Sequence, residues 1–321
     1  MPRSSRTPTV SNRSCRPASS SCASSPGWSR SRGARSPSRR SGSGGSPVLP
    51  WLPDRSVYSS GSGIDTYDIA IFAALRWERQ AVLGALADVG ICGPGRWGGR
   101  LGDGRACLVI ETGIGAERAS RVAATAPVAG CFMTSGCAGA LVPWLHAGDL
   151  VAADRVIPFD AAGRPGGALP AEADGLGAWA AARGFRLHLG PLAVSQEIVW
   201  TPSAKAAAAA IGALAVDMES AAVAAAARAR GISFVGLRVV LDELGEDLRF
   251  VTDFVDPATG EARVGRALAT LAPRPWLWRR TVRLARQRRT AERRLGAFLA
   301  AFLGPDRPAL GLDAPAAAAL S

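Results

Sequence analysis

Residues 214–242 read LAVDMESAAVAAAARARGISFVGLRVVLD, and this stretch decides the fold. Two short β-prone segments, 214–216 and 234–241, flank an alanine-rich run that is typical of a helix. Gly231 follows that run at a position typical of a helix C-terminus. Because strand, helix and strand in this order build a parallel sheet, we predict an α/β fold.

Acidic side chains follow both of these predicted strands. Asp217 and Glu219 come after the first strand, and Asp242 comes after the second. Carboxylates at the carboxyl ends of strands in such sheets usually line a ligand crevice. The alternative is that Asp217 caps the helix and Asp242 opens a turn.

The motif VDMESAAV at 216–223, followed by LRVVLD at 237–242, resembles the nucleoside phosphorylase and nucleosidase superfamily. The resemblance extends over about residues 67–242 and is to a superfamily with members such as the methylthioadenosine/S-adenosylhomocysteine nucleosidases. It implies a three-layer α/β sandwich with a central mixed, mainly parallel sheet flanked by helices. It also implies an N-glycosyl hydrolase or nucleoside phosphorylase that uses no metal and no cofactor. In the family, a Met-Glu pair holds the ribose and a later Asp protonates the purine; the matching residues are Met218, Glu219 and Asp242.

A continuous apolar segment at 68–74 predicts a buried strand, and Leu75-Arg76-Trp77-Glu78 follows it. We expect an amphipathic helix to begin there and to run through Asp88. In the nucleosidases this place holds the glutamate that activates the attacking water, and the match is Glu78. The alternative is that Glu78 is an ordinary first-turn acid, favoured by the helix dipole.

Two glycine-containing segments follow further predicted strands. The strand at 106–112 ends in Thr112-Gly113-Ile114-Gly115, where backbone N–H groups can cradle an anion or a water molecule. The resemblance assigns Thr112 and Gly113 to this substrate-side turn. The strand at 129–134 is expected to run into a small-residue loop at 135–141, in which the resemblance places Cys137 and Ala138 against the nucleoside.

Two features of the motifs bear on the reaction. Phosphorylases of the superfamily usually carry a phosphate-binding arginine just before the small-residue loop, whereas this chain has Met133 and Thr134 there. That difference favours water as the nucleophile. A nucleophilic pair of Cys137 with His146 lacks a third orienting group in a recognisable spacing.

The resemblance places the adenine slot after a predicted strand at 191–196. Val199 occupies the position where an aromatic residue is usual, and Trp200 follows it. We therefore include both residues among the expected substrate contacts.

The formal net charge of +12 is concentrated at the two ends of the chain. Residues 1–66 are rich in Ser, Arg, Pro and Gly and predict a disordered extension. We expect a catalytic domain over 67–255, a basic helical extension over 256–303 and a flexible tail over 304–321. Six cysteines without a CxxC pair, together with two histidines, argue against a zinc site and indicate a reduced, cytoplasmic protein.

Nine arginines between 274 and 303 alternate with apolar side chains, a pattern typical of a basic amphipathic helix. Such a helix can lie on an anionic membrane, which would place the protein on the inner face of the plasma membrane. Insertion would use Trp276, Trp278, Leu295, Phe298 and Phe302. The alternative is a terminal helix that docks its Leu and Phe residues on the body. Nucleic acid is not an expected partner, because no aromatic stacking platform is present.

The basic extension and the Leu-Arg-Trp-Glu segment resemble the hopanoid-associated phosphorylases, or adenosylhopane nucleosidases. This resemblance implies an adenosyl-lipid substrate, with adenosylhopane cleaved to ribosylhopane and adenine in hopanoid biosynthesis. The alternatives are a methylthioadenosine/S-adenosylhomocysteine nucleosidase and a phosphate-dependent nucleoside phosphorylase. A non-catalytic nucleoside-binding protein and a membrane adapter also stay open, as does assembly into a homo-oligomer.

Overall fold

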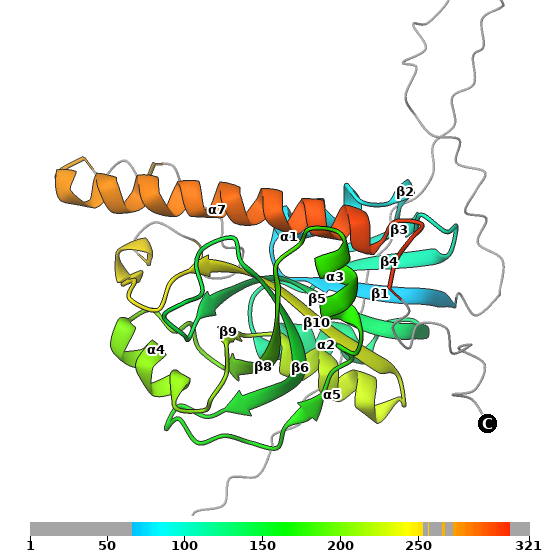
Figure 1. Ribbon diagram of the computed structural model, residues 1–321, viewed down its shortest axis with the longest axis horizontal. Coiled ribbons are helices and arrows are strands. Elements are labelled where there is room, and N and C mark those ends of the chain that lie inside the picture. The colour runs from blue at the N-terminus through cyan, green and yellow to red at the C-terminus, as the bar shows by residue number, and fades with distance from the viewer. Residues whose placement is uncertain (1–65, 253–255, 257–264, 267–271, 309–321) are drawn as a thin grey trace, which may run out of the picture. The chain divides into compact units, whose positions relative to one another are not determined.

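The computed structural model describes residues 66–252, 256, 265–266 and 272–308, so most of the predicted N-terminal extension and of the C-terminal tail lies outside the described residues. The strands are β1 Tyr67–Ala73, β2 Ala87–Gly93, β3 Arg96–Arg100, β4 Ala106–Glu111, β5 Ala129–Ala140, β6 Leu150–Phe159, β7 Leu169–Pro170, β8 Leu187–Ser195, β9 Ala215–Asp217 and β10 Ser233–Asp242. The helices are α1 Arg76–Leu83, α2 Ala116–Ala124, α3 Leu176–Ala182, α4 Pro202–Ala209, α5 Ser220–Ala229, the 3₁₀ turn η2 Arg249–Val251, and α7 Pro275–Phe302. Helices connect most of the strands, while β2 to β4 and β5 to β7 follow one another without a helix between them (Figure 1).

All of these strands belong to one mixed sheet with the order β10-β6-β8-β9-β5-β1-β4-β3-β2, and β7 pairs with β6. Strand β5 also pairs with β10, so the ladders that join β5, β10, β6, β8 and β9 close on themselves. Parallel ladders join β1 to β4 and β5, while antiparallel ladders add the β2–β3 hairpin at the far edge. The predicted α/β fold with a mixed sheet is therefore confirmed.

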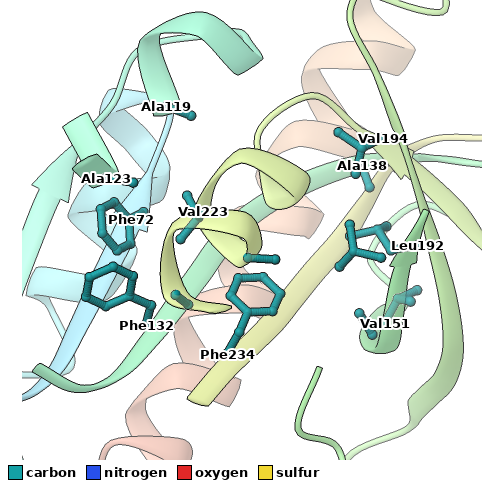
Figure 2. Close-up of a cluster of buried hydrophobic side chains, with 14 of the residues drawn as sticks. Phe72, Ala119, Ala123, Phe132, Ala138, Val151, Leu192, Val194, Val223 and Phe234 are labelled. Atoms are coloured by element: carbon teal, nitrogen blue, oxygen red, sulfur yellow. The ribbon is translucent and has the colours of Figure 1, made fainter. Parts of the chain in front are cut away.

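Alternating side chains divide between the two faces of the sheet. In β1, Ile69 and Ile71 point into one apolar cluster, whereas Ala70 and Phe72 point into the other. The first cluster is covered by α1, α3 and α7, and the second by α2 and α5. Figure 2 shows the second cluster, with Val223 of α5 near Phe132 and Phe234 of the sheet. Because successive side chains of a strand point to opposite faces of the sheet, each central strand packs against a layer of helices on both faces, as the sandwich requires.

Three local predictions need correction. Strands β9 and β10 are not neighbours, because β5 pairs antiparallel with β9 and parallel with β10. The expected loop at 135–141 is instead the second half of β5, since ladders on both sides pair its backbone. Helix α1 ends at Leu83 rather than near Asp88, because Gly84 caps it and β2 begins at Ala87.

The basic helix at the C-terminal end packs on the body. Its second half buries Leu295, Phe298, Leu299 and Phe302 in the first apolar cluster. The docked-helix alternative therefore holds for this half, and the insertion role predicted for Leu295, Phe298 and Phe302 is wrong because the core covers them. Trp276, Trp278 and Val282 of the first half stay exposed. Among the described residues, none of the helices combines the length and apolar character needed to cross a membrane.

Candidate active site

A pocket of about 360 Å³ lies where β5, β9 and β10 approach the segments that follow β1 and β8. Most of the predicted site residues line it: Glu78, Cys137, Ala138, Val199, Trp200, Met218, Glu219 and Asp242. Thr112 lines a smaller cavity that shares Glu78, Cys137 and Glu219 with the pocket. Gly113 lines neither space, and its carbonyl accepts a hydrogen bond from the Thr112 hydroxyl at 2.9 Å.

Glu78 stands in the first turn of α1, and its carboxylate is held by backbone N–H groups. Oε2 accepts from Ala74 at 3.1 Å and from Leu75 at 2.9 Å, while Oε1 accepts from Cys137 at 2.7 Å. Burial raises the pKa of Glu78 above its usual value, against these hydrogen bonds and the nearby Arg238. Gly136 makes this approach possible, because a Cβ there would lie 2.7 Å from Oε1.

The smaller cavity has a volume of about 10 Å³, which is close to the space that one water molecule needs. Its polar lining includes Glu78, Thr112, Glu219 and Arg238. A water molecule there would lie among two carboxylates, a hydroxyl and a guanidinium, which is a suitable set of partners for a nucleophilic water.

Asp217 has a structural role that matches the capping alternative. Its Oδ2 accepts from the backbone N–H of Ser220 at 3.2 Å, at the start of α5, and from the Ser220 hydroxyl at 2.6 Å. The buried Arg238 of β10 donates Nε to the same oxygen at 2.8 Å and Nη2 to Ser220 Oγ at 2.8 Å. The Thr134 hydroxyl lies 2.9 Å from Ser220 Oγ. This network fixes the β9–α5 turn that carries Met218 and Glu219.

Glu219 is half-buried on the pocket wall, directly after that turn. Its Oε1 accepts a 2.7 Å hydrogen bond from the backbone N–H of Gly115, whose φ of 104° favours glycine. Burial, followed by the charge of Asp217, raises the pKa of Glu219 to about 8. A carboxyl in this position can bind ribose hydroxyls from the pocket side.

Asp242 ends β10 and also lines the pocket. Its Oδ2 forms an ion pair with Nζ of Lys205, a residue of α4 with no exposed surface. Burial raises the pKa of Asp242, and Lys205 acts against that increase. The backbone of β5 approaches closely, because a Cβ at Gly139 would lie 3.1 Å from the same oxygen. Asp242 is thus a buried acid facing the pocket, and the turn-opening alternative does not account for its surroundings.

Helix α7 supplies the outer wall of the pocket. Its lining residues Thr281 and Leu284 are half-buried, and Ala285 and Arg288 lie exposed at the rim. Leu248 and Val251, from the segment before α7, extend the apolar part of this wall. The predicted catalytic domain and helical extension therefore share the pocket.

A cysteine–histidine pair receives no support from the geometry. Cys137 lies in the pocket beside Glu78, and burial raises the pKa of its thiol well above the usual value, which disfavours the thiolate. His146 is exposed and faces Glu243, with 3.4 Å between Nδ1 and Oε1.

Sequence reasoning missed three contributions to the site. Arg238 stood inside an apolar strand, where a charged residue signals a buried ion pair. Lys205 is the sole lysine of the sequence, but its position in an alanine-rich segment gave no local signal of a carboxylate partner. The pocket residues of α7 had no local signal, because only the tertiary docking of α7 brings them to the pocket.

Comparison with known proteins agrees with this architecture. A family model described as the Phosphorylase superfamily matches residues 96–271. That segment contains Glu219 and Asp242, whereas Glu78 precedes it and α7 follows it. A search among curated protein sequences found no match.

Solved structures with a similar fold include three bacterial enzymes. S-adenosylhomocysteine nucleosidase of Streptococcus pyogenes is 22% identical, with a TM-score of 0.51 over 61% of this chain and 90% of its own. Futalosine hydrolase of Helicobacter pylori is 22% identical, with a TM-score of 0.51 over 59% of this chain and 90% of its own. An aspartate-to-asparagine mutant of the Helicobacter pylori 5'-methylthioadenosine/S-adenosyl homocysteine nucleosidase (MTAN), with 5'-methylthioadenosine in its active site, is 19% identical, with a TM-score of 0.52 over 73% of this chain and 98% of its own.

The family match covers more than half of the chain, and the mixed sheet with its helical layers agrees with it. The chain belongs to the Phosphorylase superfamily.

Proposed function

We propose that this protein is a purine nucleosidase that hydrolyses the N-glycosidic bond of an adenosyl compound. Membership of the Phosphorylase superfamily makes it an enzyme of the N-glycosyl hydrolase or nucleoside phosphorylase class. The observation that carries the hydrolase proposal is the cavity of about 10 Å³ beside Glu78, Glu219 and Arg238. A cavity of this size suits a water molecule as the nucleophile.

Among the described residues that line the pocket, those outside α7 include no lysine or arginine that could bind phosphate. Arg238 is engaged by Asp217 and Ser220, and the position where phosphorylases of the family usually carry an arginine is occupied by Met133 and Thr134. Met133 is buried in the apolar core, and Thr134 contacts Ser220. Hydrolysis therefore fits these surroundings better than phosphorolysis does.

The carboxylates divide the reaction between them. Glu78 accepts a proton from the water as it attacks the anomeric carbon, and Asp242 donates a proton to the five-membered ring of the leaving purine. Glu219 binds the ribose hydroxyls, and Met218 packs on the sugar as the oxocarbenium-like transition state forms. Val199 and Trp200 contribute to the base slot. The products are the free sugar and the purine.

The substrate that we propose is adenosylhopane, with ribosylhopane and adenine as products. The apolar wall formed by Leu284, Leu248 and Val251 supports a nucleoside with an apolar substituent. Trp276, Trp278 and Val282 of α7 are exposed and are not part of the pocket lining. A substrate such as methylthioadenosine, with a short thioether substituent, would use only the inner part of this wall.

We further propose that the first half of α7 rests on an anionic membrane surface. Its apolar Trp276, Trp278 and Val282 lie among exposed arginines, and each arginine near an anionic leaflet contributes about 1 kcal/mol. The arginines of this half are Arg279, Arg280, Arg283, Arg286 and Arg288. Docking of the second half on the core holds this surface in place.

The test of the reaction is an assay of free adenine and of the sugar product, with and without phosphate. We expect adenine and a free sugar hydroxyl in both conditions, with adenosylhopane in vesicles cleaved more efficiently than methylthioadenosine. A sugar 1-phosphate as the main product would establish a phosphorylase. Preference for methylthioadenosine or S-adenosylhomocysteine would replace the lipid substrate, and no release from any nucleoside would leave a binding protein.

The test of membrane binding is sedimentation with vesicles that contain phosphatidylglycerol. Wild-type protein should sediment at low salt and be released as salt rises, because ions screen the arginine charges. Replacing Trp276 and Trp278 with Ser should weaken binding, while Ile91→Ser, at an exposed site on β2, should not. Wild-type protein that stays in solution at every salt concentration would refute the membrane proposal.

A further inference from the structure

The only lysine in the sequence, Lys205, is completely buried. The other basic residues of the chain, apart from two histidines, are arginines. Lysine is almost never fully buried unless its charge has a partner, because taking an ammonium out of water is costly. The only lysine ammonium of this arginine-rich chain is thus in the interior.

The partners of Lys205 lie at the end of β10. Its Nζ forms an ion pair with Oδ2 of Asp242 and donates to the carbonyl oxygen of Glu243 at 2.6 Å. Asp242 lines the pocket, whereas Lys205 stands behind it and is not part of the lining. The rest of α4 gives no reason for a charge here, since Ala208 is its other buried residue. An apolar side chain would satisfy the packing of this helix.

We propose that Lys205 is a positioning residue for the glycosidic cleavage: from α4, its ammonium holds Oδ2 of Asp242 and controls the protonation of that carboxyl. The reaction step rests on the proposed function, because it takes Asp242 as the acid that protonates the purine. Lysine suits this place because its compact ammonium bonds one oxygen of the carboxylate and the Glu243 carbonyl from a single point, whereas a planar guanidinium presents a wider fork of donors.

The physical reason is a balance of two opposed effects. Burial raises the pKa of Asp242 and so favours the neutral carboxyl, while Lys205 favours the carboxylate. A general acid works best when its pKa lies near the working pH, so that it can release and recover its proton in each cycle. Without the ammonium, burial would keep the carboxyl protonated and make it a weaker proton donor.

Other charged groups near this pair come from the turn after β10, from β5 and from α7. Glu246 raises the pKa of Asp242, and the charge of Asp242 raises that of the Cys137 thiol. Glu243 and Glu246 are both paired with Arg283 of α7, with closest distances of 3.0 and 2.8 Å. His146 faces Glu243, not Asp242. Lys205 is therefore the cation that contacts Asp242 directly among the described residues.

The first experiment uses NMR of the protein labelled at lysine, because one lysine gives one side-chain signal. We expect the wild-type ammonium to be protected from solvent, as its burial requires, and to shift strongly in Asp242→Asn. The control variant is Asp247→Asn. The Asp247 carboxylate pairs with Arg249, so this change should leave the lysine signal unchanged. A lysine signal that is the same in wild type and Asp242→Asn would overturn the proposal, and this readout does not depend on activity.

The second experiment measures adenine release against pH in wild type and Lys205→Met. The loss of activity at high pH, where Asp242 deprotonates, should move upward by about one pH unit or more, since burial then acts unopposed. A merely structural role would lower the rate without moving this limb, and that result would overturn the proposal. If wild type releases no adenine from any nucleoside, the proposed function fails and the lysine signal decides the role of Lys205.

A stability measurement covers the case in which Lys205→Met folds poorly. The double variant Lys205→Met with Asp242→Asn removes both buried charges, so its loss of unfolding free energy should be smaller than the sum of the single losses. Additive losses would show that the two side chains do not act as a pair and would contradict the proposal.

Discussion

The two walls of the pocket differ in what they are made of and in how they are held. The inner wall consists of strand ends and helix starts, and it carries Glu78, Glu219 and Asp242, each fixed by backbone hydrogen bonds or an ion pair. The outer wall is one face of α7, where Thr281 and Leu284 present mainly apolar surface. The inner wall is suited to chemistry on any nucleoside, and the outer wall to contact with the group that distinguishes one nucleoside from another.

This difference has an energetic basis. A buried carboxylate needs partners at fixed distances, and a sheet with paired strands supplies them. An apolar contact has no such directional requirement, so a helix docked through its far end is sufficient. Variants of the inner wall should therefore affect all substrates strongly, and variants of the outer wall should affect selected substrates weakly.

The largest effect is expected for Asp242→Asn. An amide of the same shape cannot donate the acid's proton, so adenine release should fall by roughly a hundredfold to ten-thousandfold for every substrate. Removal of the charge also leaves Lys205 buried without its partner, so stability should be measured together with the rate. Asp247→Asn, outside the pocket lining, is the matched control and should keep its activity. Turnover close to wild type in Asp242→Asn would show that Asp242 is not the general acid.

Glu78→Gln should produce a loss of similar or somewhat smaller size, roughly a hundredfold or more. As a general base Glu78 must be ionised, and burial raises its pKa, so the wild-type rate should fall as pH drops through that raised value. The variant should lose this acidic limb, which a pH profile of kcat/KM would show. The exposed Glu117→Gln provides the control. An acidic limb that survives in Glu78→Gln belongs to another group.

Much of the fold could be predicted because its signals are local. Central strands such as 68–74 and 234–241 are apolar on both faces, and the alanine run before Gly231 has one reasonable conformation. The loop expected at 135–141 failed for a physical reason. Glycine and small residues often mark loops, but here they let β5 approach Glu78 and Asp242 while its ladders continue.

The carboxylates of the inner wall could be proposed from their positions after strands, and the structure brings all three to one pocket. Their partners could not be proposed in this way. Lys205 reaches Asp242 across 37 positions, and Gly115 reaches Glu219 across 104. The outer wall could not be predicted for the same reason. The position of α7 is set by core contacts such as those of Phe298 with Trp179 and Phe185.

Glu219→Gln, a change in the inner wall, should raise the stability of the protein while it weakens substrate binding. The pKa of about 8 in the folded protein lies above the usual 4.5, so wild-type stability should decrease as pH rises from about 4.5 through about 8. The variant lacks this penalty and should unfold with a free energy higher by on the order of 1–3 kcal/mol at pH 8, a gap that closes toward pH 5. Above pH 8, where the Glu219 carboxyl is ionised, the variant's ribose binding should weaken by about tenfold through loss of a charge-assisted hydrogen bond. Thermal unfolding at several pH values and KM measurements test both parts; equal stability at pH 8 would contradict the first.

The smallest effect is expected on the outer wall, from Leu284→Ser compared with Val282→Ser. These side chains are two positions apart on α7, yet Leu284 lines the pocket and Val282 is exposed, so both variants change the helix alike but only one changes the wall. Burial of a leucine side chain contributes about 1.5–3 kcal/mol, of which a substrate contact can use a part. Leu284→Ser should therefore raise KM by roughly tenfold for a nucleoside with a long apolar substituent and change it little for adenosine. Val282→Ser should leave both values unchanged in detergent. If Leu284→Ser raises KM equally for the two substrates, the outer wall binds the nucleoside itself, and the separate roles proposed for the two walls are wrong.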